Sequence, residues 1–174
     1  MSIYEFEGHS PLIDTDAYID PEAVLIGSVT IGRGCFVGAG AVLRADFGEI
    51  IVGNHSNVQE NCVIHVSPGK KVWIQENVTI GHGAILHDAM IHTGAIIGMG
   101  SILLQDVVVE EGAMVAAGAV VSTGFTVRAR KMVSGNPAKI QKNLPESFQE
   151  RMKTGLALYK TLPRRYKKGA RRIK

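Results

Sequence analysis

A six-residue repeat of aliphatic residues runs through most of this sequence and limits the folds that the chain can adopt. Ile, Leu or Val recurs every six positions, provided that the frame gains three residues after Leu43, gains four after Ile64 and loses one after Leu86. The repeat occupies Ile19, Leu25, Ile31, Val37, Leu43, Val52, Val58, Ile64, Ile74, Ile80, Leu86, Ile91, Ile97, Leu103, Val109, Val115 and Val121. A period of six fits neither an α-helix nor a long amphipathic strand, but it fits short strands separated by tight corners.

Small residues and glycines accompany the repeat. Four positions after each aliphatic residue the side chain is usually small or modest, as at Ala23, Cys35 and Ala84. Sixteen of the 20 glycines lie between residues 19 and 124, where they supply the backbone conformations that tight corners need. One Trp, four Tyr and five Phe are too few to fill a core, so the core must be aliphatic. The apolar fraction of 45% and the lack of a three-residue period exclude a disordered chain and collagen.

This pattern resembles the hexapeptide-repeat family over roughly residues 10–140. The resemblance implies an all-β fold, a left-handed parallel β-helix in which three hexads form one triangular coil and neighbouring coils lie about 4.8 Å apart. Cys35 and Cys62 occupy the small inward position, so we expect buried, reduced thiols. We assign residues 1–140 to the β-helix domain and residues 141–174 to a C-terminal α-helix with a basic tail.

The segment after the repeat predicts one α-helix. Ser134-Gly-Asn-Pro-Ala-Lys139 resembles the closing turn that is common in the family. Between Pro145 and Lys160 the apolar residues have the spacing of one helical stripe, at Phe148, Met152, Leu156 and Tyr159. We expect this helix to pack back on the prism and to end at Pro163.

Three histidines have related positions in the repeat. His65 and His87 each directly follow a repeat residue, as Arg44 does, and the separations of 21 and 22 residues equal one coil plus the extra residues of the frame. We therefore expect these three residues in one outward column, with the two imidazoles about 4.8 Å apart and able to share a metal. His82 belongs to another face, so it could reach that metal only from a neighbouring prism. A third nitrogen ligand would leave one position for water, as in catalytic zinc sites.

Several short strings resemble the signature of γ-class carbonic anhydrases. They are Arg44-Ala-Asp46, Asn57-Val-Gln59, His65, and Gly81-His82 followed by His87. The resemblance implies a homotrimer that holds Zn²⁺, or alternatively Fe²⁺ or Co²⁺, at each subunit interface. The implied ligands are His65 and His87 from one subunit and His82 from the next.

The same resemblance implies roles for five further residues. It makes Arg44 and Asp46 an ion pair between subunits, places Gln59 beside the metal-bound water, and gives Asn57 a supporting position. Tyr159 resembles a tyrosine of the C-terminal helix that approaches the metal in some relatives.

A metal held by neutral imidazoles lowers the pKa of bound water to about 7. The resemblance therefore implies a carbonic anhydrase-like lyase that hydrates carbon dioxide to bicarbonate, although the same hydroxide could attack a thioester. Phe47 replaces an acidic residue of the best-studied γ enzymes, and the loop Val66–Lys71 has no acid, so the family's route for proton transfer is missing.

Other residues favour other activities. Asp46-Phe47-Gly48 and the opening Ile3–Gly8 look most like the branch that contains a phenylacetate-degradation thioesterase and carnitine-operon proteins. The alternatives are a metal-dependent acyl-CoA thioesterase, an accessory protein of acyl-CoA metabolism, a hexapeptide acyltransferase, and a scaffold in which the metal only stabilises the trimer.

The net charge of +3 is unevenly distributed. Eight Lys or Arg and no acid lie from Lys160 to Lys174, whereas residues 1–159 carry 11 bases and 16 acids. We interpret the basic segment as a solvated tail and expect no nucleic-acid partner, because it has one aromatic residue and no recognised motif. No run approaches the roughly 20 apolar residues of a membrane span, and Met1–Glu7 lacks the features of a secretory signal. We therefore expect a cytoplasmic protein that acts on a small molecule.

Overall fold

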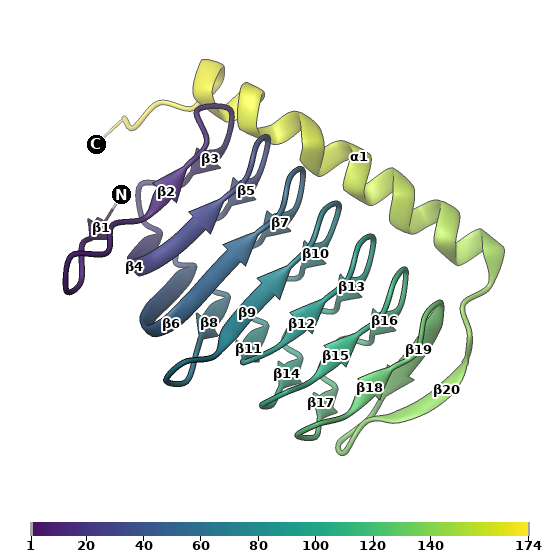
Figure 1. Cartoon of the computed structure of the whole chain (residues 1–174). Helices are drawn as coiled ribbons and strands as arrows, with labels where there is room; N and C mark the ends of the chain where they lie inside the picture. Colours follow the sequence, from purple (N-terminus) through teal and green to yellow (C-terminus); the bar gives the residue numbers. More distant parts are fainter. Residues whose placement is uncertain (1, 174) are drawn as a thin grey trace.

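The computed structural model describes residues 2–173, with only the backbone at residues 141 and 142, and shows a triangular prism of parallel strands with one long helix beside it (Figure 1). This is the all-β, hexapeptide β-helix with a C-terminal α-helix that the repeat predicts. Met1 and Lys174, the outer ends of the two predicted domains, lie outside the described residues.

Each coil contributes one short strand to each of three faces, which we call A, B and C. Face A contains β8 (Val63–His65), β11 (Ile85–His87), β14 (Ile102–Leu103) and β17 (Val120–Val121). Face B contains β2 (Leu12–Ile13), β9 (Lys71–Ile74), β12 (Met90–Ile91), β15 (Val108–Val109) and β18 (Thr126–Val127). Two longer strands, β4 (Val24–Ile31) and β6 (Val42–Val52), bend across the corner between faces A and B, and β1 (Ser2–Tyr4) pairs with the first half of β4.

Face C is a separate sheet. It contains β3 (Tyr18–Ile19), β5 (Phe36–Val37), β7 (Asn57–Val58), β10 (Thr79–Ile80), β13 (Ile96–Ile97), β16 (Met114–Val115), β19 (Lys131–Ser134) and β20 (Lys139–Asn143). All pairs are parallel except β19 with β20. The antiparallel hairpin closes the last coil, and the chain then enters the helix.

The core is a stack of aliphatic layers, one residue for each hexad. All repeat positions that the sequence predicts are buried, and Val127 and Val133 continue the series beyond its predicted end. The small companion positions are buried as well, including Cys35 and Cys62. Burial raises the pKa of both thiols to about 11, which keeps them protonated near neutral pH and confirms that they are packing residues.

Some corners admit only glycine. Gly27, in the bend of β4, has φ +75°, and a Cβ there would lie 2.4 Å from the carbonyl oxygen of Ala45 on the next coil. We expect Gly27→Ala to destabilise the protein by about 3 kcal/mol or more, because the left-handed backbone costs about 1–2 kcal/mol and overpacking about 1–3 kcal/mol. The free energy of unfolding from urea titration at fixed protein concentration measures this loss.

A matched variant isolates the role of the neighbouring carbonyl. Gly118 has φ +68°, but no atom lies within 4 Å of the position that its Cβ would take. Gly118→Ala should therefore lose only the conformational part, about 1–2 kcal/mol. Equal losses in the two variants would show that close approach of the coils does not matter at Gly27.

The C-terminal helix α1 (Glu146–Gly169) is longer than the sequence predicts. It lies along face C (Figure 1) and contacts β3 and β5. The prediction that it ends at Pro163 is wrong, because that proline is buried inside the helix. Tyr159 and Tyr166 pack on Phe36 with ring centroids 5.9 Å and 5.3 Å away, one on each side of the proline. These contacts offset the roughly 3 kcal/mol that an interior proline costs a helix.

The extended helix also changes the interpretation of the basic segment. Most of the predicted tail is helical as far as Gly169, and only the last few described residues are not. In the described part of the chain, no helix combines the length and the apolar character that a membrane crossing requires.

Candidate functional site

The predicted column of outward residues is confirmed by the strand register. Arg44 of β6 pairs with His65 of β8, and His65 pairs with His87 of β11. The His65 Nδ1 atom lies 3.2 Å from the His87 Nε2 atom, and the ring centroids are 5.0 Å apart. The three extra residues lie within β6, where its register with β4 shifts, and the four extra residues lie in the loop between β8 and β9, so both leave this register intact.

The separation of the two ring nitrogens suits a shared metal. Two nitrogens bound to one tetrahedral zinc at about 2.0–2.1 Å lie about 3.3 Å from each other, which matches the distance between His65 and His87. Both side chains are partly exposed at the prism corner, so a further ligand can approach from outside.

Carboxylates stand beside both imidazoles of the column. His65 Nε2 donates to Asp46 Oδ1 at 3.0 Å, and His87 Nδ1 lies 3.2 Å from Asp88 Oδ2 without the direction of a hydrogen bond. Such carboxylates orient histidine ligands in metal sites. Burial opposes the ionisation of Asp46, but hydrogen bonds from His65 and Arg44 outweigh it and lower the pKa of this carboxyl group.

Asp88 is held by the loop between β8 and β9. The backbone N–H and the hydroxyl of Ser67 donate to its two carboxylate oxygens at 2.7 Å and 2.6 Å. Burial again opposes ionisation, yet these bonds lower the pKa of Asp88, so the group beside His87 is anionic. Asp88 is a site residue that the sequence prediction lacks, although it directly follows His87.

Arg44 and Asp46 contact each other within one chain. The sequence analysis assigns them to an ion pair between subunits, and that assignment stays a prediction. In the single chain, Asp46 connects Arg44 to His65 and so fixes one ring of the column.

His82 lies on another corner, between faces C and A, as the frame predicts. Its Nδ1 atom is 2.6 Å from Glu60 Oε2, although the contact does not have hydrogen-bond geometry. Glu60 stands 22 residues before His82, the same separation that relates His65 to His87, so the coil period would have identified it. The side chain of His82 is 46% exposed, so its ring can be reached from outside the prism.

Gln59 and Asn57 form a buried amide chain behind His82. The backbone N–H of His82 donates to Gln59 Oε1 at 3.2 Å, and Gln59 Nε2 donates to Asn57 Oδ1 at 3.0 Å. Asn57 Nδ2 in turn donates to Thr79 Oγ1 at 3.0 Å. The hydrogen bonds fix both amides, so Gln59 is a rigid, buried polar group on face C beside the His82 corner.

One chain does not bring the three histidines together. Among the residues that the structure describes, no three His, Cys, Asp or Glu side chains converge as metal ligands. His65 and His87 project from the corner between faces A and B, whereas His82 projects from the corner between faces C and A. The three-histidine set therefore stays a prediction for an assembly of several chains.

Tyr159 is a residue of α1 and lines a groove between this helix and face C, which we call the helix groove. The groove has a volume of about 360 Å³ and is lined mainly by apolar residues of face C and α1, namely Gln59, Thr79, Ile96, Met114, Phe148, Arg151, Met152, Gly155, Leu156 and Tyr159. Burial raises the pKa of Tyr159, so its hydroxyl is protonated near neutral pH. Gln59 and Tyr159 thus line the same groove, and Gln59 also accepts a hydrogen bond from the backbone N–H of His82.

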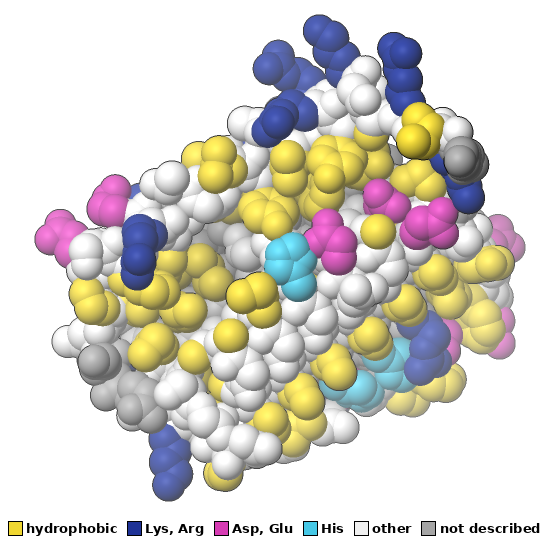
Figure 2. All heavy atoms as spheres, turned by 180° about the vertical axis from the view of Figure 1, so that it is seen from behind, with side chains coloured by type: hydrophobic (Ala, Val, Ile, Leu, Met, Phe, Trp, Pro, Cys, Tyr) yellow, Lys and Arg dark blue, Asp and Glu magenta, His cyan; other side chains and the backbone are white. Residues whose placement is uncertain are grey.

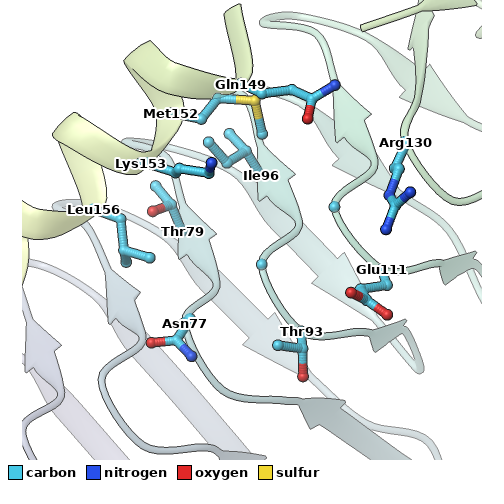
Figure 3. Close-up of a pocket in the computed structure, with 12 residues that line it drawn as sticks. Asn77, Thr79, Thr93, Ile96, Glu111, Arg130, Gln149, Met152, Lys153 and Leu156 are labelled. Carbon is cyan, nitrogen blue, oxygen red and sulfur yellow. The ribbon is translucent and has the colours of Figure 1, made fainter. Parts of the chain in front are cut away.

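A second cavity lies on the other side of α1 (Figure 3). Its volume is about 210 Å³, and turns at the corner between faces B and C supply Asn77, Thr93, Glu111 and Arg130. Met152, Lys153 and Leu156 close it from the helix. Its lining contains none of the residues that the sequence predicts for the site, so it is separate from the histidine corners.

The chain is similar to hexapeptide proteins from several bacteria. Residues 10–45 match the family model described as bacterial transferase hexapeptide (six repeats). The carnitine operon protein CaiE of Proteus sp. (strain LE138) is 40% identical over 169 residues, which are 97% of this chain and 86% of that protein.

Two solved structures share both fold and sequence. A hexapeptide transferase family protein from Anaplasma phagocytophilum is 36% identical with a TM-score of 0.91, over 95% of this chain and 98% of that chain. A putative acetyltransferase from Bacillus cereus is 32% identical with a TM-score of 0.94, over 95% of this chain and 96% of that chain.

These relatives correct the enzyme class that the sequence implies. They are named as carnitine operon, transferase and acetyltransferase proteins, so the expectation of a carbonic anhydrase-like lyase is wrong. The chain differs from γ-class carbonic anhydrases at the histidine column itself. Phe47 is 53% exposed there, and its ring lies 5.9 Å from that of His65. An apolar ring stands where proton transfer would need an acid. The chain belongs to the hexapeptide-repeat transferase family, as a relative of the carnitine operon protein CaiE.

Proposed function

We propose that this protein cleaves acyl-CoA thioesters at a centre formed where two subunits of a trimer meet. The His65–His87 pair, with a carboxylate beside each ring, carries the proposal, because it is a rigid and oriented pair of nitrogen donors at an open corner. The similarity of this chain to a putative acetyltransferase from B. cereus supports chemistry on acyl groups. In the reaction, water adds to the thioester carbonyl, the C–S bond breaks, and CoA leaves as its thiol.

His65 and His87, with His82 of the partner subunit, would hold a Zn²⁺, Fe²⁺ or Co²⁺ ion. Such an ion supplies water of lowered pKa. Asp46 orients the His65 ring through a hydrogen bond, Asp88 and Glu60 place a carboxylate beside His87 and His82, and Gln59 offers a fixed amide beside the centre.

The helix groove suits the acyl group of the substrate. It is lined by apolar side chains of β13, β16 and α1, and its polar end is formed by Gln59 beside His82. An acyl chain in the groove would lose contact with water while its thioester stays near the histidine corner. The groove would therefore select the acyl chain by length.

Bulk in the groove should change substrate preference. Met114 is a half-buried groove residue on face C, so we expect Met114→Trp to lower kcat/KM for octanoyl-CoA by about tenfold or more and to affect acetyl-CoA little. Steady-state hydrolysis of a series of acyl-CoA thioesters, followed through the released thiol, measures this shift. Met90→Trp is the matched control, because Met90 lies on face B, away from the groove. Equal effects on long and short substrates would contradict the groove assignment.

A second candidate function rests on the contact between His82 and Glu60. An exposed imidazole beside a carboxylate can act as a general base, and here it could deprotonate an acceptor hydroxyl or amine for acyl transfer without a metal. Acyl transfer that survives a chelator and His65→Ala, but not His82→Ala or Glu60→Gln, would favour this function. If the chelator and each of the variants His65→Ala, His82→Ala and Glu60→Gln abolish activity, the result would favour the metal centre shared between subunits.

A further inference from the structure

The C-terminal half of α1 and three corner turns, which precede β3, β5 and β7, form a strongly basic concave surface, which we call the basic cleft. It has a volume of about 670 Å³ and is lined by Asp16, Arg33, Gly34, His55, Lys160, Pro163, Arg164, Lys167 and Lys168. Figure 2 shows Lys and Arg side chains gathered along this end of the helix. Five of the lining residues are Lys or Arg, and one is an acid.

The two sides of the basic cleft are held in fixed positions. The turn with Arg33 is tied to the next coil, because the backbone N–H of Arg33 donates to Asn54 Oδ1 at 2.9 Å and that of His55 donates to the Arg33 carbonyl at 2.8 Å. On the opposite side, Pro163 is buried and the Lys167 ammonium contacts the carbonyl oxygen of Thr15. The cleft is therefore a formed feature and not a mobile tail.

The positive charges in the cleft are not neutralised by the protein. Within the described residues, no carboxylate lies within 4.0 Å of a side-chain nitrogen of Arg33, Lys160 or Arg164, and the same holds for Lys167 and Lys168. All five residues are exposed, so water screens part of the repulsion between their charges, and an anion placed among them relieves the rest. Four of the five cations lie on the last three turns of α1, where the helix dipole also favours positive charge.

The shape of the cleft favours a small phosphorylated ligand over a polymer or a membrane. Its volume lies within the range of small-molecule sites, about 300–1,000 Å³. The lining offers no Phe, Tyr or Trp ring on which bases of a single strand would stack, and no large apolar side chain that would enter a bilayer. Arginine and lysine together are suited to phosphate esters.

We propose that the basic cleft binds the phosphate groups of coenzyme A, that is, its diphosphate and its 3′-phosphate. The inference rests on the proposed function, which supplies CoA as the ligand, while the charge and the shape of the cleft supply the contacts. CoA carries three phosphate groups, and five cations without a carboxylate partner can neutralise them. The cleft determines affinity for the carrier, whereas the histidine corner and the helix groove act on the acyl group.

Isothermal titration of the full-length protein with CoA, dephospho-CoA and ATP tests the site. We expect CoA to bind about tenfold or more tightly than dephospho-CoA, which lacks the 3′-phosphate, and more tightly than ATP. Arg33→Glu and Arg164→Glu should each weaken CoA binding about tenfold or more, and added salt should weaken binding to the wild-type protein. Circular dichroism melts show whether each variant is folded, and Arg33→Gln provides a milder change at the same position.

Arg171→Glu is the matched control, because Arg171 belongs to the same basic segment but does not line the cleft. An equal loss of affinity in Arg171→Glu would show a general charge effect and overturn the proposal. Binding of ATP as tight as that of CoA would overturn it as well, as would binding of phosphatidylserine vesicles or an oligonucleotide but not of CoA. If CoA binds in the cleft while no thioester is cleaved, the proposed function fails and the cleft assignment stands.

Discussion

The His82→Ala variant is expected to lose bound metal and thioester cleavage together, although His65 and His87 remain intact. Metal content should fall from about one ion per chain to near zero, because two imidazoles alone hold zinc weakly. Turnover should fall by at least about 100-fold, since removing even an outer-shell partner of a metal site costs 10–100-fold. Elemental analysis of purified protein and steady-state hydrolysis of an acyl-CoA measure the two quantities. His92→Ala is the control, because His92 lies outside the histidine corners, in the turn after β12.

Mixing two inactive variants tests whether the centre is shared between chains. His65→Ala subunits keep His82, and His82→Ala subunits keep His65 and His87. Random assembly of equal amounts into trimers would restore about a quarter of the interfaces, because one interface in four combines the intact residues. Stoichiometric metal in His82→Ala protein, or no recovery after unfolding and refolding the mixture, would contradict the shared centre.

Leu103→Ala should be among the most destabilising single substitutions in the prism. Leu103 of β14 is 0% exposed and belongs to the stacked core, so its truncation leaves a cavity that rigid neighbouring coils cannot fill. We expect a loss of about 2–5 kcal/mol in the free energy of unfolding. Urea titration at fixed protein concentration measures it, since assembly makes the apparent stability depend on concentration.

The adjacent residue is the control for this experiment. Leu104 has the same side chain but is 37% exposed, so Leu104→Ala should cost only about 0.5 kcal/mol. A similar loss in the two variants would mean that the hexad frame does not determine which leucine supports the core. A much larger loss in Leu104→Ala at low protein concentration would instead reveal that its corner is covered in the trimer.

The hexad frame explains why so much of the fold could be predicted. One aliphatic residue for each hexad fixes which side chains point inward, and the parallel coils then fix which outward residues are neighbours. For this reason the burial of Ile64 and Leu86 and the pairing of His65 with His87 follow from spacing alone. The same spacing places Glu60 beside His82, since these two residues are also 22 positions apart.

The helix could not be predicted in the same way. Pro163 is a local stop signal, and its cost is offset only because Tyr159 and Tyr166 both pack on Phe36, which lies more than 100 residues earlier in the chain. Contacts between such distant residues depend on where the helix lies on face C. The helix groove and the basic cleft depend on the same placement, so neither could be inferred from the sequence.

The six-residue period specifies the aliphatic core and the column that contains His65 and His87, because a periodic chain has only one register that buries all its aliphatic residues. The tertiary structure decided how α1 runs along face C, which carboxylates stand beside the histidines, and where the C-terminal cations without a carboxylate partner gather. These features depend on non-periodic contacts between distant residues, whose energies outweigh local preferences such as that of Pro163.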